Sequence, residues 1–272
     1  MWTALAMTAA LSYAPAQQGG ELSITNIRPT MGILGAPRKD ADNPKLLVGD
    51  AIILSFDIEN LKVGEDGQVV YAVGFKLVDT KKDKLIYEEK PSKEPLRSIT
   101  SLGGGRVPAF VATQIGTETE PGEYELTAVV EDRAAMKEKK FSKKFEVVPA
   151  AFGLVRLNLT YDEEGRLPAP PLCVAGQRLV ANFYATGFER DKTSKQPNIT
   201  FKMRILEGGK PVIGKDWGGS IKNAPETWKM IPANFFLHLN RPGKFTVELE
   251  ATDEVSKKTA KQSFDLTVQE LK

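Results

Sequence analysis

A stretch of alternating polar and apolar residues occurs twice in this chain, about 120 residues apart. PGEYELTAVVED occupies residues 121–132, and PGKFTVELEATD occupies residues 242–253. After each Pro-Gly pair, apolar residues fall at every second position, beginning with Tyr124 in the first copy and Phe245 in the second. Period-two alternation predicts a β-strand with one buried and one wet face, and the Pro-Gly pair predicts the turn before it.

Three further blocks upstream match in the same order. Residues 48–61 match 175–188, residues 74–79 match 200–205, and residues 107–110 match 231–234. In the strand that closes each copy, Phe145 and Val147 align with Phe264 and Leu266. The offset falls from 127 residues (175 minus 48) to 121 (242 minus 121), as small loop insertions and deletions produce. The repeated order therefore predicts an internal duplication.

The alternation predicts about seven short strands in each copy and no helix of ordinary length. The first set lies near residues 22–27, 51–58, 69–78, 84–88, 107–113, 123–131 and 140–148, and the second near 152–159, 178–186, 198–206, 211–214, 229–239, 244–252 and 261–268. Seven short antiparallel strands in about 120 residues are typical of a β-sandwich. We expect one sandwich over residues 21–148 and a second over residues 152–269, joined by a short linker.

The motif G-x-Y-x-L at residues 122–126 resembles the penultimate strand of immunoglobulin-like domains. Leu126, and Val247 in the second copy, stand where antibody-type domains carry their second cysteine, so that subset is excluded. The chain resembles bacterial extracytoplasmic immunoglobulin-like modules of the PKD or cadherin-like kind. The resemblance implies two tandem immunoglobulin-like antiparallel β-sandwiches that act as spacers, adhesion units or accessory binding domains, and it supplies no site. Tyr124 is expected to bond a backbone carbonyl across the sandwich, as in a tyrosine corner.

The N-terminus has the pattern of an export signal. Residues 2–13 are apolar or small, and Ala14-Pro15-Ala16 fits a signal-peptidase site, although no Lys or Arg precedes the apolar run. We expect residues 1–16 to be a signal peptide, a mature chain that begins near Gln17, and a secreted or periplasmic protein. No later apolar run approaches about 20 residues, so we expect no transmembrane segment in the mature chain.

Composition excludes some classes of partner. The 272 residues are 41% hydrophobic and 26% charged, and the net charge is +2. This balance suits a globular protein and gives no basic patch, so no nucleic-acid partner is expected. Cys173 is the only cysteine, which allows no internal disulfide, and we interpret it as a small buried residue.

The sequence offers no set of residues for catalysis. His238 is the only histidine, so any Ser-His-Asp or Cys-His arrangement would need it, and we interpret it as structural. The acidic runs at residues 40–43 and 162–165 lack the spacing of a calcium loop and are interpreted as solvated loops. The three glycines at 103–105 lack the Lys-Ser/Thr ending of a phosphate loop. We therefore assign no catalytic, cofactor-binding or metal-binding residue and expect no cofactor.

Two segments are candidates for binding. Trp217 and Trp228 flank a Gly-, Asn- and Pro-rich stretch that is predicted to be a loop, and exposed aromatic residues on loops often anchor proteins or glycans. Packing of both rings into the sandwich is the favoured expectation, and a binding surface is the alternative. Residues 31–45 form a connection longer than usual, of the kind that is often functional or disordered.

Three classes of function compete on this evidence. We favour a non-catalytic secreted or periplasmic module for binding or adhesion, with an unknown protein or glycan as its partner. The alternative is a purely structural spacer in a larger cell-surface assembly. A β-sandwich hydrolase is the weakest alternative, because the sequence contains no evident nucleophile and base.

Overall fold

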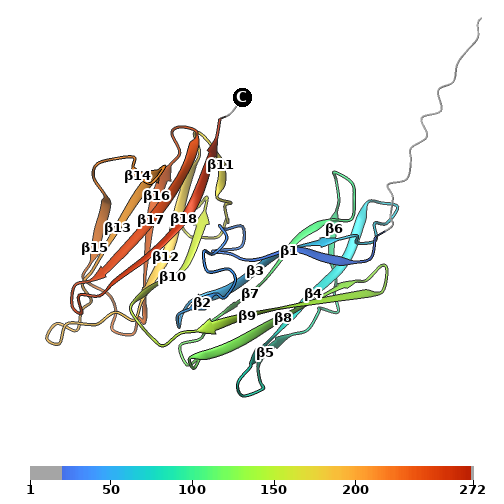
Figure 1. Cartoon of the computed structure of the whole chain (residues 1–272), viewed down its shortest axis with the longest axis horizontal. Coiled ribbons are helices and arrows are strands. Elements are labelled where there is room, and N and C mark those ends of the chain that lie inside the picture. The colour runs from blue at the N-terminus through green and yellow to red at the C-terminus, as the bar shows by residue number, and fades with distance from the viewer. Residues whose placement is uncertain (1–19, 271–272) are drawn as a thin grey trace, which may run out of the picture.

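The computed structural model describes residues 20–270 as two β-sandwiches that lie side by side at an angle (Figure 1). The first sandwich contains β1 (Ser23–Pro29), β2 (Lys45–Leu46), β3 (Ala51–Glu59), β4 (Gln68–Asp79), β5 (Lys84–Glu89), β6 (Leu96–Ile99), β7 (Val107–Gln114), β8 (Gly122–Asp132) and β9 (Lys137–Val147). The second contains β10 (Gly153–Thr160), β11 (Leu172–Val174), β12 (Arg178–Thr186), β13 (Ile199–Glu207), β14 (Lys210–Pro211), β15 (Trp217–Ile221), β16 (Met230–His238), β17 (Gly243–Asp253) and β18 (Thr259–Gln269). No α-helix occurs in this range, and so none that could cross a membrane.

The two sandwiches have the same strand order. The smaller sheets run β1-β3-β7 and β10-β12-β16. The larger sheets run β2-β9-β8-β4-β5 and β11-β18-β17-β13-β14, and β6 and β15 make an additional pair with β4 and β13. This is the order of an immunoglobulin-like sandwich, with β3, β4, β8 and β9 in the places of strands B, C, F and G. The all-β, two-sandwich prediction is confirmed.

The predicted count of seven strands per copy was too low, because each sandwich has nine. The missed strands are β2, β6, β11 and β15, which have two to five residues and no clear alternation. The first of these in each sandwich also pairs in parallel, β2 with β9 and β11 with β18, whereas the remaining pairs are antiparallel. Strands this short are recognisable only by their partners.

The likeness of the two sandwiches extends to the details of the backbone. β8 and β17 have the same alternation of buried and half-buried residues. Phe56 pairs with Ala109 in the first sandwich, and Phe183 pairs with Ala233 in the second. β1 and β10 each carry a bulge, in which Asn26 (φ 52°) and Arg156 (φ 53°) adopt the left-handed conformation. Such matched irregularities are typical of two copies of one ancestral domain.

The sequence alignment of the closing strands was wrong by two residues. Tyr124 pairs with Phe145 in the first sandwich, and Phe245 pairs with Leu266 in the second. Phe145 therefore corresponds to Leu266, not to Phe264. Because side chains alternate with a period of two, a shift by two residues leaves the buried face unchanged, and the pattern alone cannot detect it.

Tyr124 and Phe245 are both core residues, with 3% and 9% of their surfaces exposed. The Tyr124 hydroxyl donates a 2.8 Å hydrogen bond to the carbonyl oxygen of Glu120. The acceptor is a backbone carbonyl, as expected, but it lies four residues upstream, as in a tyrosine corner, rather than across the sandwich. The Glu120 carboxylate in turn pairs with Lys82, whose hydrogen bond and charge lower the pKa of that carboxyl.

The second sandwich builds the same corner with different chemistry. The Arg241 guanidinium lies 4.9 Å from the centroid of the Phe245 ring and makes two hydrogen bonds of 2.9 and 2.7 Å to Glu207. Arg241 stands 121 residues after Glu120, which is the offset between Phe245 and Tyr124. The second sandwich therefore has a cation over the ring in place of the tyrosine hydroxyl bond. The charges of the ion pair are also exchanged, because Arg241 is the cation at the position where Glu120 is the anion.

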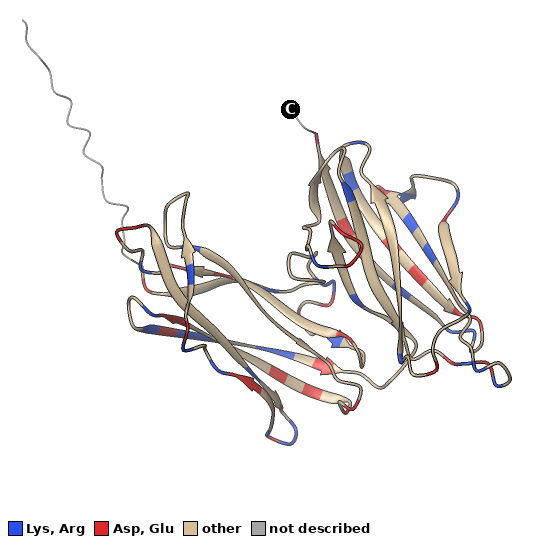
Figure 2. Cartoon of the chain, turned by 180° about the vertical axis from the view of Figure 1, so that it is seen from behind, with Lys and Arg blue, Asp and Glu red and all other residues tan. Residues whose placement is uncertain are grey.

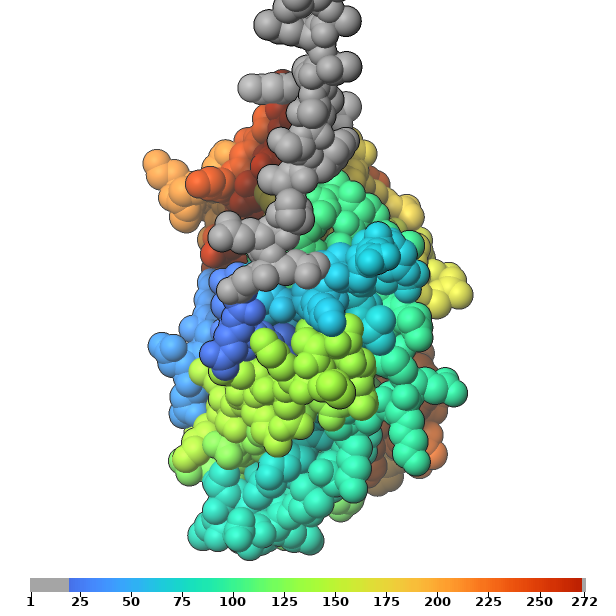
Figure 3. All heavy atoms as spheres, turned by 90° about the vertical axis from the view of Figure 1, so that its right-hand side faces the viewer, coloured from blue at the N-terminus to red at the C-terminus, as the bar shows by residue number. Residues whose placement is uncertain are grey.

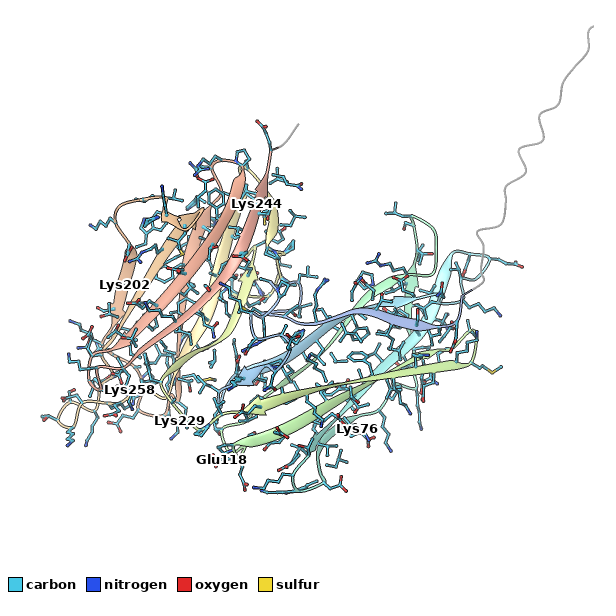
Figure 4. All side chains as sticks on the ribbon, viewed as in Figure 1. Lys76, Glu118, Lys202, Lys229, Lys244 and Lys258 are labelled. Carbon is cyan, nitrogen blue, oxygen red and sulfur yellow. The ribbon has the colours of Figure 1, made fainter. Side chains whose placement is uncertain are left out.

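The outer faces of the larger sheets carry charged residues. Lys76 in β4 and Lys202 in β13 project from these faces (Figure 4) and are exposed. In the end-on view of Figure 3, the β8–β9 hairpin and the β4–β5 hairpin form much of the face of the first sandwich that is turned toward the viewer. Acidic and basic residues are interspersed over both sandwiches (Figure 2), which agrees with the small net charge.

Candidate functional site

The two candidate tryptophans are exposed, which corrects the favoured expectation that they pack into the sandwich. Trp217 and Trp228 each expose 44% of their surface. Trp217 begins edge strand β15, opposite Met203, in a segment that was expected to be a loop. It lines a small hollow of about 90 Å³ with Val212 and His238. Edge strands have no neighbour on one side, so a large side chain there is only partly covered.

Trp228 lies in the turn before β16, where its carbonyl accepts a hydrogen bond from Arg190. It lines neither the small hollow nor the larger one described below. The structure therefore does not bring Trp217 and Trp228 into one hollow, and their role as a binding surface stays a prediction.

The other singled-out residues have local roles. Cys173 is buried, its thiol donates to the carbonyl of Pro170, and burial raises its pKa. His238 is exposed at the end of β16. Asp162 accepts hydrogen bonds from the backbone N–H groups of Arg166 and Leu167, which shapes its acidic loop. Among residues 20–270, no group of three His, Cys, Asp or Glu could hold a metal ion.

The long connection after β1 is ordered and lies between the two sandwiches (Figure 1). Ala36, from this connection, is part of the core cluster of the second sandwich, and Met31 packs against that cluster. Lys39 Nζ donates a 2.7 Å hydrogen bond to Ser263 Oγ in β18. The segment thus joins the sandwiches, and of the two alternatives for it, functional or disordered, the structure excludes the second.

Arg156 connects the sandwiches from the other side. Its backbone N–H donates to Asp50 Oδ1 at 3.0 Å, its Nε donates to the Gly49 carbonyl at 2.7 Å, and a terminal nitrogen donates to Gln114 Oε1 at 3.0 Å. The bulge in β10 points this side chain toward the first sandwich. The equivalent residue, Asn26, bonds within its own sandwich, to Asp57 at 2.6 Å. The bulge residue of the first sandwich therefore bonds within its own sandwich, whereas the equivalent residue of the second sandwich bonds across the joint.

A hollow of about 1030 Å³ opens at the joint, is lined by both sandwiches and extends along the second one. One wall is the outer face of the β3–β7 pair, where Ile53 lies opposite Ala112 and Ala51 lies opposite Gln114. The second sandwich lines the other side with outward-facing residues of the sheet β10-β12-β16, such as Asn182 and Tyr184. Residues of its core and of its larger sheet also line the hollow, among them Phe183, Phe235, Phe201 and residues 218–221. We call this hollow the interdomain cleft. Its volume lies at the upper end of the range of small-molecule sites, and domain boundaries are a common place for such sites.

A row of three asparagines crosses the second wall. Asn158 in β10 pairs with Asn182 in β12, which pairs with Asn234 in β16, so the three carboxamides stand side by side on one face. All three line the cleft. Tyr184, two residues from Asn182, lies beside this row, with the Arg156 guanidinium 5.7 Å from its ring centroid. We call Asn158, Asn182 and Asn234 the amide row.

The two ends of the amide row differ in exposure. Asn234 is exposed, whereas Asn158 is half-buried and its Oδ1 is buried without a hydrogen-bond partner among the described residues. Gly32 closes this end so tightly that a Cβ there would lie 2.1 Å from Asn158 Oδ1. A buried acceptor without a donor costs about 1–3 kcal/mol. A water molecule or a ligand hydroxyl that reached this end would supply the missing donor.

Most of the charged groups that line the cleft are already paired. Arg38 pairs with Asp50, and both side chains are 8% exposed. Glu163 lies 3.9 Å from Arg178, and Glu164 lies 3.6 Å from Arg166. Arg156 is held by the bonds described above. The cleft therefore presents carboxamides and small apolar groups to a ligand, rather than a strong field of one sign.

The amide row was not predicted from the sequence. Asn182 and Tyr184 occupy polar positions of an alternating strand, which identifies them only as outward-facing. Asn158 lies in an Asn-Leu-Thr triplet, and Asn234 in Ile-Pro-Ala-Asn. Nothing in these patterns shows that the three residues share one register or that another sandwich faces them.

Comparisons with known proteins add no family. No family model matches the sequence, and no curated protein matches it. Among solved structures, red sea bream transglutaminase is similar at 10% identity and a TM-score of 0.27, covering 92% of this chain and 31% of the enzyme. A family 123 glycoside hydrolase from Clostridium perfringens is similar at 14% identity and a TM-score of 0.33, covering 47% of this chain and 27% of the hydrolase.

A third similar structure is the CARDB domain of a Pyrococcus furiosus protein, solved in complex with di-metal ions. It has 13% identity and a TM-score of 0.26, and the match covers 45% of this chain and 93% of that domain. This chain spans less than a third of the two enzymes. All three TM-scores are low, and they give no argument about activity.

Proposed function

We propose that this protein is a non-catalytic binding module of the secreted or periplasmic space, and that the interdomain cleft holds its ligand. The amide row in the cleft is the observation on which this proposal rests. A purely structural spacer requires a rigid contact between the sandwiches. It does not require a row of carboxamides that line a hollow of about 1030 Å³, whereas a binding site does. Tandem sandwiches of the PKD or cadherin-like kind are the module type that we propose.

Export is part of this proposal. It rests on the apolar run and the Ala14-Pro15-Ala16 site, which lie outside the described residues. N-terminal sequencing of the protein from its native cell should find Gln17 at or near the first position. Recovery of an intact Met1 would contradict export through this signal.

The proposal that the cleft binds a ligand can be tested by placing a large side chain in the cleft. Ala112 is exposed on the wall opposite the amide row, so Ala112→Trp would occupy the hollow without changing any asparagine. We expect saturable binding of the protein to at least one probe on arrays of glycans and peptides, and at least a tenfold loss of affinity in Ala112→Trp. The steric reason is that an indole ring takes the volume that the ligand needs.

Lys76→Trp is the matched control, because it adds the same ring to the outer face of β4, away from the cleft. It should bind as the unchanged protein does. Failure to bind any probe, or binding that Ala112→Trp leaves unchanged, would contradict the proposal and favour the spacer. Turnover of a bound glycan or peptide would instead favour the hydrolase.

A further inference from the structure

We infer that the ligand of the interdomain cleft is a neutral oligosaccharide segment. This inference rests on the proposed function and adds the chemical class of the ligand. It is carried by three features of the cleft: the amide row, the apolar wall that faces it, and the pairing of the charges around it.

The amide row matches the hydrogen bonding of sugar hydroxyls. A carboxamide has an acceptor oxygen and a donor NH₂ group, and a hydroxyl can both donate and accept, so the two groups bond in either direction. Asn182 gives one N–H to Thr160 Oγ1 at 2.7 Å, and its Oδ1 accepts no hydrogen bond from residues 20–270. Gln114, on the opposite wall, accepts from Arg156 through Oε1, which leaves its NH₂ group available to a ligand.

The spacing of the amide row suits an extended ligand. Neighbouring strands lie about 4.8 Å apart, so three aligned asparagines extend over about 10 Å across the sheet. Tyr184 lies two residues along β12, which is about 6.7 Å from Asn182 along the strand. A ligand lying along the row therefore meets three carboxamides and one aromatic side chain.

The opposite wall is apolar where the amide row is polar. Ile53 and Ala112 are directly paired neighbours on the outer face of the first sandwich. A sugar ring has hydroxyls at its edge and C–H groups on its faces, so it can contact both walls at once. Tyr184 can pack against the same C–H groups while its hydroxyl stays in water.

Two alternative ligands fit less well. An anionic ligand needs available cations, but the Arg38 guanidinium is 8% exposed and bound to Asp40 and Asp50. The Arg156 guanidinium already donates to the Gly49 carbonyl and to Gln114, and Glu163 and Glu164 add negative charge to the lining of the cleft. An extended peptide is usually held by main-chain bonds to a free sheet edge. Asn182 stands on the central strand of its sheet, where the backbone groups are already paired with β10 and β16 on both sides.

The test uses the whole chain and defined hexasaccharides. Isothermal titration would be run with neutral gluco-, xylo-, manno- and chito-hexaoses, with an anionic galacturonate hexamer, and with a pool of extended hexapeptides. We expect at least one neutral oligosaccharide to bind, and no binding of the anionic hexamer. Asn182→Ala and Asn234→Ala should each weaken binding about tenfold, because each removes hydrogen bonds to hydroxyls.

Thr127→Ala and Thr246→Ala are the controls, because these residues lie on β8 and β17 of the larger sheets, outside the cleft. Their affinities should not change, and far-UV circular dichroism should show all four variants folded. Binding of a peptide or of the anionic hexamer that Ala112→Trp abolishes would overturn the oligosaccharide inference and keep the proposed function. Absence of binding to every probe would overturn both.

Discussion

Tyr124→Ala should lower the free energy of unfolding of the first sandwich by about 3–5 kcal/mol, and Phe245→Ala should do the same in the second. Both rings are buried, and each is the first apolar side chain of the central strand of its larger sheet. Tyr124 stacks on Phe145 with ring centroids 5.8 Å apart, so truncation leaves a cavity beside another aromatic ring. Loss of the tyrosine corner adds to the cavity cost.

Tyr124→Phe separates these two contributions. It keeps the ring and removes the 2.8 Å hydrogen bond to Glu120, so it should cost only about 0.5–1.5 kcal/mol. Phe245 has no hydroxyl, and its ring instead contacts Arg241, so Arg241→Ala is the corresponding variant in the second sandwich.

Urea unfolding of the whole chain can distinguish the sandwiches. With Trp2 replaced by phenylalanine, the remaining tryptophans, Trp217 and Trp228, lie in the second sandwich, so fluorescence follows that sandwich alone. Circular dichroism follows both. Phe245→Ala should shift the fluorescence transition strongly, and Tyr124→Ala should shift mainly the dichroism. Losses below about 1 kcal/mol in both alanine variants would contradict the core assignment.

Arg156→Asn should loosen the joint between the sandwiches while each stays folded. Asparagine tolerates the left-handed conformation, and Asn26 occupies the equivalent position in the first sandwich. The variant keeps the backbone bond to Asp50 and loses the side-chain bonds to Gly49 and Gln114. Two such bonds are together worth about 1–3 kcal/mol.

Small-angle X-ray scattering provides the measurement for the joint. The pair-distance distribution of Arg156→Asn should broaden, because the sandwiches sample more orientations, and the midpoint of the fluorescence transition should fall slightly. Arg166→Asn is the control, since Arg166 is exposed and its ion pairs, to Asp162 and Glu164, lie within one loop. Unchanged scattering in Arg156→Asn would show that segment 30–44 holds the joint without it.

The amino-acid sequence by itself determined the longer strands and the repetition of their pattern in two sandwiches. Alternation is a local property, so the buried faces of β8 and β17 can be recognised from eleven residues each. Tyr124 and Phe245 were assigned to the core on this basis, and both are buried. The turns are local as well. Asp132 and Asp253 end their strands by accepting backbone N–H bonds from the residues that follow.

Only the tertiary structure decided where the short strands, the tryptophans and the cleft lie. β15 exists because β13 offers it a partner, and Trp217 is exposed because that strand is at the edge of its sheet. The amide row depends on the register of three strands whose asparagines are separated by 24 and 52 residues (182 minus 158, 234 minus 182). The joint depends on the connection after β1 and on the Arg156 side chain, which cross between the two sandwiches. These features depend on contacts between segments that are far apart in the sequence. The alternation of polar and apolar residues in each segment would be the same if those contacts did not form, so it cannot predict them.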